Sequence, residues 1–318
     1  MIFTVILCSA ILLDQIFGDP RIFAYLKIHP VILTGYLINF LRRIFFKNIF
    51  SFRDGFFLCV TTLSITGFFA FLILYVSKCS IYVQILMLYF ALAWRDLKDE
   101  TEKVFLCLIE DNIEGARKFL SRVVGRDTEN LEKHEIISAL IETISENSID
   151  GIISVIFFAA LGYLINNSYG MIIAVWLFKA ASTLDSMVGY ESFGKFGTAS
   201  ARLDDILNFI PARIGGFVII FAGILLCGNA KNALKIFLHD RKNHKSPNSA
   251  HGESAFAGVL NIKLGGGAFY NGKFSPRPFI NEKANTPELY DILRAWKLLD
   301  VSCFLFMFFM IFLVILLT

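Results

Sequence analysis

Six apolar stretches separated by polar segments constrain this chain more than any other feature of its sequence. They cover residues 1–17, 55–77, 80–94, 151–165, 169–184 and 299–317. A helix needs about 20 apolar residues to cross a bilayer, so these lengths are typical of membrane helices, several of them tilted or buried in a bundle. Only 18% of the residues are charged, against about 25% in soluble domains. The sequence therefore predicts an all-α, polytopic membrane helix bundle.

The distribution of Lys and Arg predicts the orientation of this bundle. Segments 18–54 and 95–150 hold six and eight of these residues, and segment 229–298 holds eleven. Because Lys and Arg mark the cytoplasmic side, we place the first two segments and 185–213 inside and both termini outside. A seventh apolar stretch, 214–227, would put the most basic loop outside if it crossed, so we predict a re-entrant segment there and six crossings in all.

The long polar segments 95–150 and 229–298 are expected to belong to one integral membrane domain that comprises residues 1–318. In the first of them, apolar residues such as Val104 and Leu108 alternate with charges. This pattern predicts an amphipathic helical hairpin that turns at 112–115, with a helix pair on the lipid surface as the alternative. We expect a multi-pass protein of the plasma membrane whose site faces the cytoplasm.

Composition also excludes some classes of function. The net charge of +3 is too small to indicate nucleic-acid binding, and no basic stripe alternates with aromatic residues. The six cysteines show no CxxC spacing, so neither a redox motif nor a cysteine zinc site is predicted. Three histidines, His239, His244 and His251, lack cysteine partners and helical spacing, and they do not favour zinc.

Two clusters of acidic residues adjoin the apolar stretches. The motifs DQIFGDP and HPVILTG contain Asp14, Asp19 and His29, although turn chemistry explains them as well as a binding site does. The motif ETISENSIDG spaces Glu142, Glu146 and Asp150 four residues apart, which stacks three carboxylates on one helical face. Such a face is destabilised unless a cation lies between the charges. With Asn147 nearby, it predicts a Mg²⁺ or substrate-ammonium site, or alternatively a solvated face.

The helix predicted at 169–184 ends in polar and charged residues. Lys179 lies among apolar residues, and Asp185, Ser186 and Tyr190 follow in STLDSMVGY. Ionisable groups inside a membrane segment are candidates for function, although a lysine can also extend to the interface. The acid and the hydroxyl one to two turns further on favour the functional interpretation.

Two further clusters combine acids, bases and glycines. In FGTASARLDDILNFIPAR, one short amphipathic helix is expected to carry Arg202, Asp204, Asp205, Asn208 and Arg213. Adjacent acids suit a divalent ion and arginines suit phosphate, whereas surface pairing is the alternative. The segment His239 to Gly272 offers further ligands for an anion, but it contains no P-loop. These are Lys245, Ser246, Pro247, Asn248, Glu253 and the run Gly265, Gly266 and Gly267.

Six motifs in a fixed order resemble one known family. They are DxxxGDP, HPVxxxG, ENxxDG, KAxSTLDSMVGY, ARxDDxxNxxPAR and SPNSxxxExAxAGxLxxxLGG. Residues 14–272, which contain them, resemble the adenosylcobinamide-phosphate synthases, integral membrane proteins of cobalamin biosynthesis. The part after Tyr270 matches this family less well, and no residue in it is assigned a role.

The resemblance implies a ligase that joins a propionate carboxylate of adenosylcobyric acid to the amine of (R)-1-aminopropan-2-ol or of its O-phosphate. It also implies ATP as co-substrate and Mg²⁺ as cofactor. Membrane lipid and other enzymes of the corrin pathway are the further partners it suggests. Phosphorylating a carboxylate with ATP needs Mg²⁺ held by carboxylates and cations on the phosphates.

This chemistry assigns expected roles to the clusters. Metal or amine binding is expected at Glu146, Asn147, Asp150, Asp204 and Asp205. Catalysis is expected at Asp185, as general base beside Lys179, and at Asp204 and Asp205. Contacts to substrate or phosphate are expected at Asp14, Asp19, His29, Ser186, Tyr190, Arg202, Asn208, Arg213, Lys245, Ser246, Asn248, Glu253, Gly265 and Gly266.

Two other classes of function stay open. Polytopic chains with charges near their spans are often transporters, but here the charges lie at helix ends rather than in broken, repeated helices at mid-bilayer. A non-catalytic sensor that binds a corrinoid is the other alternative.

Overall fold

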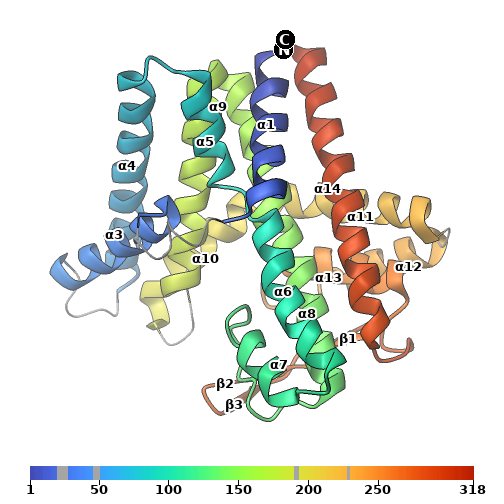
Figure 1. Cartoon of the computed structure of the whole chain (residues 1–318). Helices are drawn as coiled ribbons and strands as arrows, with labels where there is room; N and C mark the ends of the chain where they lie inside the picture. The colour runs from blue at the N-terminus through green and yellow to red at the C-terminus, as the bar shows by residue number, and fades with distance from the viewer. Residues whose placement is uncertain (20–27, 46–50, 190–192, 228–229) are drawn as a thin grey trace. The chain divides into compact units, whose positions relative to one another are not determined.

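The computed structural model describes residues 1–19, 28–45, 51–189, 193–227 and 230–318. These residues form two compact units, each built from segments far apart in the sequence. Unit 1 comprises Met1–Arg95, Ser154–Asn208 and Phe308–Thr318, and unit 2 comprises Asp96–Ile153 and Phe209–Met307. Helices dominate both units (Figure 1). The predicted all-α membrane class is therefore confirmed.

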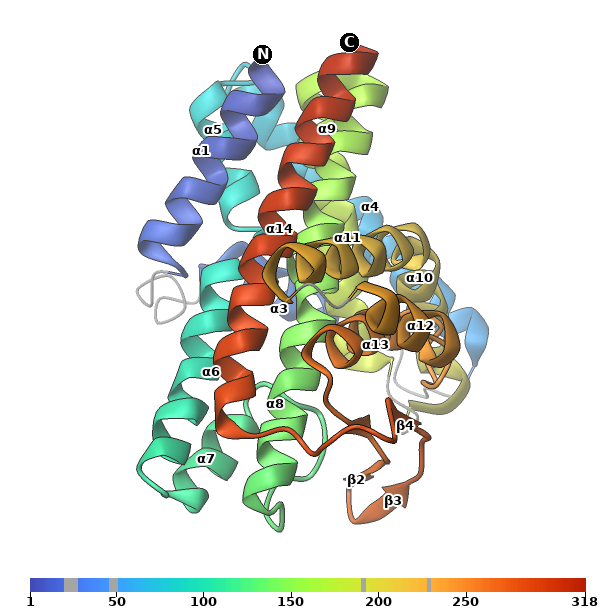
Figure 2. The ribbon, with the colours of Figure 1, turned by 90° about the vertical axis from the view of Figure 1, so that its right-hand side faces the viewer.

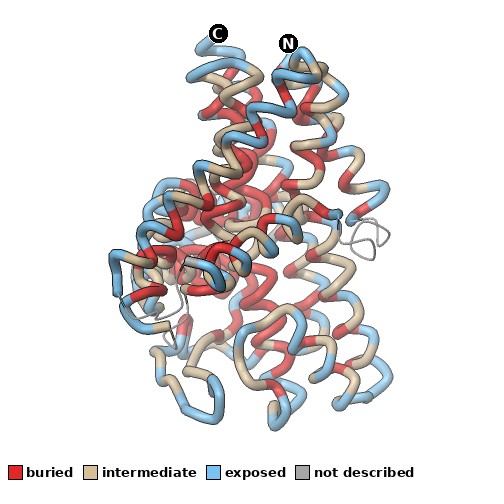
Figure 3. Tube along the Cα trace, turned by 90° about the vertical axis from the view of Figure 1, so that its left-hand side faces the viewer, coloured by how far each residue is buried: buried red, intermediate tan, exposed pale blue. Residues whose placement is uncertain are grey.

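Unit 1 is built from helices, most of which are apolar. They are α1 (Ile2–Phe17), α3 (Pro30–Phe45), α4 (Phe52–Val76), α5 (Ile81–Tyr89), α9 (Ser154–Val188), α10 (Gly194–Leu207) and the end of α14 (Leu289–Leu317). Along the helices, buried and exposed positions alternate (Figure 3). In α4, only 28% of the most apolar window is buried, and Phe56, Phe68 and Phe69 are exposed. An exposed face of this composition suits contact with lipid.

Among the described residues, four helices are long and apolar enough to cross a membrane. They are Phe52–Val76, Lys133–Val188, which contains the break described below, Phe209–Leu226 and Leu289–Leu317. The stretch predicted to cross at 80–94 forms only the nine-residue helix α5, which is about 14 Å long against a hydrocarbon core of about 30 Å. The predicted number of six crossings is therefore not confirmed.

Helix α9 is a hairpin of two antiparallel arms. Asn166 and Asn167 leave helical geometry, the latter with φ of 47°. Contacts between the two arms support this arrangement. The rings of Phe158 on the first arm and Phe178 on the second stack with centroids 4.9 Å apart, and Gly162 packs against Gly170. The two arms correspond to the apolar stretches predicted at 151–165 and 169–184, with the turn in the predicted place.

The close packing of the α9 arms predicts a specific sensitivity at Gly162. A Cβ atom at this position would lie 2.2 Å from the carbonyl oxygen of Gly170 and 2.8 Å from the Cβ of Ala174. Gly162→Ala is expected to destabilise the protein by about 1–3 kcal/mol, because the arms must separate to relieve the clash. Thermal unfolding in detergent measures the effect.

Gly35→Ala is the matched control for this substitution. A Cβ at Gly35 would meet only the side chain of Met187, at 3.5 Å, which is ordinary van der Waals contact. Equal melting temperatures for the two variants would show that the arms do not pack as described.

Both ends of the chain belong to unit 1 and lie at the same end of it (Figures 1 and 2). This arrangement agrees with the expectation that both termini face the same side of the membrane. Which side they face stays a prediction.

Unit 2 combines helices with four short strands. The helices are α6 (Trp94–Ile109), α7 (Ile113–Leu120), α8 (Lys133–Ser148), the π-helix η1 (Ile149–Ile153), α11 (Phe209–Cys227), α12 (Ala230–Asp240), α13 (Ser249–Leu260) and the first part of α14. The strands pair antiparallel as β1 (Leu264–Gly265) with β4 (Phe279–Ile280), and as β2 (Ala268–Tyr270) with β3 (Lys273–Ser275).

The predicted amphipathic hairpin is present in unit 2. Helix α6 ends at Ile109 and α7 begins at Ile113, with the Asn112 side chain accepting a hydrogen bond from the Gly115 N–H at 2.8 Å. Val104 and Leu108 are fully buried. The Trp296 indole on α14 donates to the Thr101 hydroxyl at 3.0 Å, so α6 packs against the start of α14.

Helix α13 is the centre of unit 2. All of its residues from Ala250 to Leu260 are buried, and it contacts α8, α11 and α12. Small residues allow this: Gly252 lies against the carbonyl of Ser145, and Gly258 against the backbone of Ala233. Helices whose contact positions are small can approach closely. The polar residues of α13 are thereby held in a packed interior.

Helix α11 contains the stretch predicted to be re-entrant, 214–227. It begins earlier, at Phe209, and meets the length and hydropathy of a spanning helix. Within unit 2 it runs across α8 rather than alongside it (Figures 1 and 2). Whether this helix crosses or re-enters the membrane stays a prediction.

Candidate functional site

The residues predicted to form the site are distributed over both units, so each set is described within its own unit. Tyr190 lies outside the described residues. Unit 1 holds Asp14, Asp19, His29, Lys179, Asp185, Ser186, Arg202, Asp204, Asp205 and Asn208. Unit 2 holds Glu146, Asn147, Asp150, Arg213, Lys245, Ser246, Asn248, Glu253, Gly265 and Gly266.

In unit 1, the acids that follow the first helix have structural partners. The buried Asp14 carboxylate accepts hydrogen bonds from the Arg95 N–H and the Gln15 amide, both at 3.1 Å. Arg95 lies in the first turn of α6, where backbone N–H groups have no partner within the helix. Asp14 therefore caps α6. Asp19 lies 3.0 Å from the His29 imidazole.

The predicted helix that unites Arg202 with Arg213 is wrong. Helix α10 ends at Leu207, with Asn208 as its C-cap, and Arg213 lies on α11, because Pro211 lacks an N–H and favours a new helix start. The Asn208 amide donates to Asp204 at 3.0 Å and accepts from the Ser154 hydroxyl at 2.7 Å. Asn208 is buried and connects α10 to α9.

The remaining unit 1 candidates lie on the second arm of α9 and on α10. Lys179 and Asp185 are both half-buried and six residues apart, which corresponds to about 9 Å along a helix. Ser186 and Arg202 are exposed, and Asp205 is half-buried. Their predicted roles stay predictions.

Unit 2 contains a buried cluster of four charged side chains, hereafter the ion cluster. It consists of Glu142 on α8, Glu253 on α13, Arg126 and Arg277. The Arg277 guanidinium lies 2.6 Å from Glu142 and 3.0 Å from Glu253, and Arg126 pairs with Glu142. Both glutamates are about 2% exposed. Two cations thus neutralise two carboxylates in the packed interior.

The ion cluster shifts the protonation of its members. Burial raises the pKa of Glu253 to about 7, and the carboxylates of Glu142 and Glu146 add to this, although Arg277 opposes them. Burial alone would lower the pKa of Arg277, but Glu253 and Glu142 outweigh it and hold the value above its ordinary range. Burial therefore favours the protonated form of Glu253 more than that of an ordinary glutamate, and Arg277 is the partner that stabilises its charged form.

The expectation that Gly265 and Gly266 bind phosphate through their N–H groups is not supported. The Gly265 N–H donates to the Glu142 carboxylate at 2.8 Å, and the Gly266 N–H donates to the Pro278 carbonyl at 3.4 Å. The glycine turn does bind an anion, but this anion is a side chain of the protein. Glu142 likewise does not share a metal-binding face with Glu146 and Asp150, because two arginines already neutralise it.

Glu146 lies at the edge of the ion cluster. It accepts a hydrogen bond from the Ser249 hydroxyl at 2.7 Å, whereas the Asn147 amide donates to the Thr143 carbonyl at 2.9 Å. The imidazole Nδ1 of His244 accepts the Ser246 N–H at 3.0 Å. Burial lowers the pKa of His244, and Arg277 lowers it further, although Glu146 and Glu142 oppose this. His244 is therefore held in its neutral form within the 244–248 turn.

Whether the described residues could hold Mg²⁺ depends on which oxygen ligands lie close together. Among the described residues, no group of three or more His, Cys, Asp or Glu is placed to hold a metal ion. Mg²⁺ needs only one or two carboxylates when substrate phosphates complete its shell. Glu146 at the end of α8 and Asp150 in the π-helix η1 are half-buried and fit that limited role. Single π-helical turns are frequent at functional sites.

A pocket of about 430 Å³ lies between α11, the end of α12 and the start of α13, hereafter the basic pocket. It is lined by Arg213, Arg241, Lys242, His244, Lys245, Pro247 and His251. Burial, together with Arg213 and Arg241, lowers the pKa of His251 to about 4, so its imidazole is neutral. Four cations and no carboxylate line the pocket, which is the composition expected of a site for a polyanion.

Several predicted residues meet at the basic pocket. Arg213 and Lys245 line it directly. The Arg213 guanidinium donates to the Asn248 side chain at 3.2 Å, and the Ser246 hydroxyl accepts the Asn248 N–H at 3.2 Å. The structure thus brings Arg213 and the 245–248 turn together although 32 or more positions separate them in the sequence.

Sequence reasoning missed Arg126, Arg241 and Arg277. Arg126 lies in the segment interpreted as an ordinary amphipathic hairpin, and Arg277 lies in SPRP, beyond the motifs of the family resemblance. One signal was present: Glu142 and Glu253 lie in segments of apolar and small residues, and buried carboxylates require cationic partners. The prolines on both sides of Arg277 also indicate a fixed backbone.

Comparison with known proteins identifies the family. The family model described as "CobD/Cbib protein" matches residues 7–299. The chain is 38% identical to the cobalamin biosynthesis protein CobD of Clostridium perfringens over 316 residues, which cover 92% of each chain. It is 41% identical to the protein of the same name from Clostridium tetani over 284 residues, 86% of each chain. No solved structure matches. With its motifs, its helical fold and these relatives in agreement, the chain belongs to the CobD/CbiB family.

Proposed function

We propose that this chain is a membrane enzyme of cobalamin biosynthesis that uses ATP to join a corrinoid carboxylate to an amine. The names of the relatives support the pathway. The observation that carries the use of ATP is the basic pocket, because its four cations suit the phosphates of a nucleotide. The substrates proposed are adenosylcobyric acid and (R)-1-aminopropan-2-ol or its O-phosphate, and the site is proposed to face the cytoplasm.

The proposed reaction has two steps, phosphorylation of the carboxylate and attack by the amine. A carboxylate oxygen attacks the terminal phosphate of ATP, which gives an acyl phosphate and ADP. The amine then attacks the acyl carbon, the carbon–nitrogen bond forms, and inorganic phosphate leaves as the amine loses a proton. Within unit 2, Arg213, Arg241, Lys242 and Lys245 would hold the phosphates. The role of Asp185 of unit 1 as general base is a separate proposal, carried by the sequence motif. Mg²⁺, held in part by Glu146 and Asp150, would neutralise phosphate charge.

The reaction itself provides the test. Purified protein in detergent is incubated with adenosylcobyric acid, ATP, Mg²⁺ and the amine, with or without its phosphate. We expect mass spectrometry to detect an amide product together with ADP, and no product when ATP is omitted. Asp185→Asn is expected to reduce the rate about 100-fold or more, as loss of a general base does.

Two outcomes would replace this proposal. Tight corrinoid binding without consumption of ATP would identify a sensor. Corrinoid flux into proteoliposomes, with no amide formed, would identify a transporter.

A further inference from the structure

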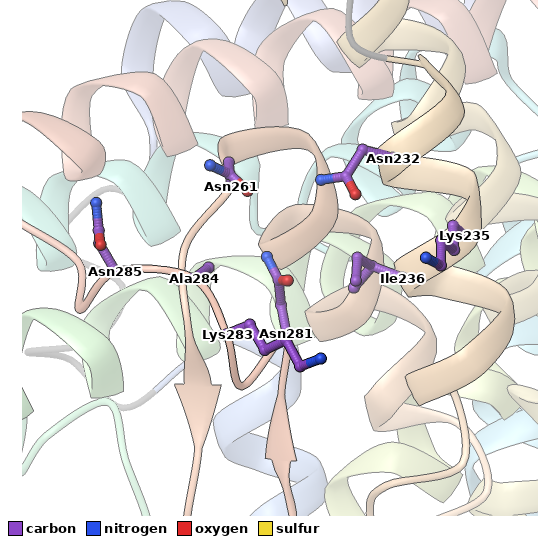
Figure 4. A pocket seen from close by; sticks show the side chains of 8 residues that line it. All are labelled: Asn232, Lys235, Ile236, Asn261, Asn281, Lys283, Ala284 and Asn285. Atoms are coloured by element: carbon purple, nitrogen blue, oxygen red, sulfur yellow. The ribbon is translucent and has the colours of Figure 1, made fainter.

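A second pocket lies at the opposite end of the α12–α13 pair from the basic pocket (Figure 4). It has a volume of about 300 Å³ and is hereafter the Asn-rich pocket. Helix α12, the C-cap of α13 and the segment after β4 line it. The lining residues are Asn232, Lys235, Ile236, Asn261, Asn281, Lys283, Ala284 and Asn285.

The walls of the Asn-rich pocket are held by internal hydrogen bonds. The Asn281 amide donates to the carbonyls of Ala257 and Ile262, at 3.1 and 3.2 Å. The Lys263 N–H donates to the Asn285 carbonyl at 2.8 Å. Asn261 ends α13 in the left-handed conformation, with φ of 57°. These bonds fix the loop backbone, so the pocket is part of the folded structure.

The lining of the Asn-rich pocket defines the chemistry it can recognise. Asn232, Asn261 and Asn285 supply both N–H donors and carbonyl acceptors, whereas Asn281 supplies its carbonyl, because its N–H groups donate to Ala257 and Ile262. Two ammonium groups supply further donors, and no lining residue is acidic. Figure 4 shows the side chain of Asn232 turned toward Asn281 and Asn261. A ligand that carries primary carboxamides matches this mixture, because each of its amides can pair with an asparagine and its carbonyls can accept from lysine.

The separation of the two pockets limits the size of the ligand. Helices α12 and α13 are antiparallel, since Ala233 packs against Gly258 and Phe237 against His251. His251 lines the basic pocket and Asn261 lines the Asn-rich pocket. Ten residues of helix correspond to about 15 Å. A small amine bound in the Asn-rich pocket could not reach a nucleotide in the basic pocket, whereas a macrocycle could extend from one toward the other.

We propose that the Asn-rich pocket binds the carboxamide-bearing edge of the corrinoid substrate, which leaves its free carboxylate directed toward the basic pocket. This inference rests on the proposed function, because that function supplies the corrinoid. It assigns substrate recognition to residues outside the charged clusters, among them Asn232 and Lys235 on one face of α12.

Direct binding measurements on the full chain in detergent test this inference. Adenosylcobyric acid is titrated and followed by its visible absorption, and ATP binding is measured separately. For the double variant Asn232→Leu/Lys235→Met, we expect the Kd of the corrinoid to rise about 10- to 100-fold, as loss of two or three hydrogen bonds predicts. ATP affinity should not change. Lys231→Met, on the same helix but outside the pocket, is the matched control.

The outcomes separate the two proposals. If the wild type forms product and the double variant binds corrinoid as tightly as the wild type does, only the pocket assignment is overturned. If the wild type binds no corrinoid, both fail. If the double variant loses ATP binding as well, the single variant Asn232→Leu decides: a corrinoid Kd about tenfold higher, with ATP binding intact, supports the assignment, and an unchanged corrinoid Kd overturns it.

Discussion

Replacing Arg277 by methionine is expected to lower the free energy of unfolding by about 3–5 kcal/mol, because breaking a buried ion pair leaves a buried charge without its partner. Arg277 is only 13% exposed and bridges Glu142 on α8 and Glu253 on α13. Methionine retains much of the apolar volume, so the loss reports on the charge rather than on a cavity. Thermal or urea unfolding in detergent measures it.

The loss caused by Arg277→Met should also depend on pH. Burial and the neighbouring carboxylates raise the pKa of Glu253 to about 7, and removal of Arg277 raises it further. A group whose pKa is raised on folding stabilises the folded state at low pH and loses this contribution as the pH rises. The variant should therefore be closest to the wild type below pH 7 and farthest from it at pH 8.

Arg294→Met is the matched control for Arg277→Met. Arg294 pairs with Asp291 one helical turn away and is 31% exposed, so its loss is expected to cost less than about 1 kcal/mol. If both variants were equally stable, the ion cluster would not hold unit 2 together in the way that its geometry indicates.

Local sequence features were sufficient to predict several elements of the fold. The turn at 78–79 is present, with positive φ at Lys78 and Cys79. The break after residue 165 is also present, because asparagine tolerates the left-handed conformation that Asn167 adopts. Each of these features depends on the chemistry of a few consecutive residues, which the sequence shows directly.

The charged interior of unit 2 could not be predicted in the same way. Arg277 and Glu142 are 135 positions apart, and Arg126 pairs with Glu142 from a different segment. Such pairs form because the fold buries both partners, and the spacing of residues within one segment does not predict a partner from another segment. Spacing alone indicated either a Mg²⁺ or substrate-ammonium site or a solvated face for the stack of Glu142, Glu146 and Asp150, since like charges at this spacing destabilise a helix unless a cation lies between them. Glu142 does have cationic partners, but they are the side chains of Arg126 and Arg277.

Removing a cation from the basic pocket is expected to reduce activity by weakening the binding of ATP. Arg241 lines this pocket, and its buried Nε makes no hydrogen bond with any of the described residues. An N–H donor held in this state can bind an anion without giving up an existing bond. Arg241→Gln is therefore expected to reduce kcat/KM for ATP about 10- to 100-fold, the usual effect of losing a charged hydrogen bond.

The kinetic and stability measurements on Arg241→Gln show whether Arg241 binds phosphate or stabilises the fold. A phosphate contact predicts a higher KM for ATP, an unchanged melting temperature, and a weaker dependence of ATP affinity on salt, because one cation fewer is screened. Lys118→Gln, at an exposed position on α7, should change none of these. If Arg241→Gln instead lowered the melting temperature and left the KM unchanged, the four cations would be structural. Arg202, which is exposed in unit 1, would then be the next predicted phosphate ligand to test.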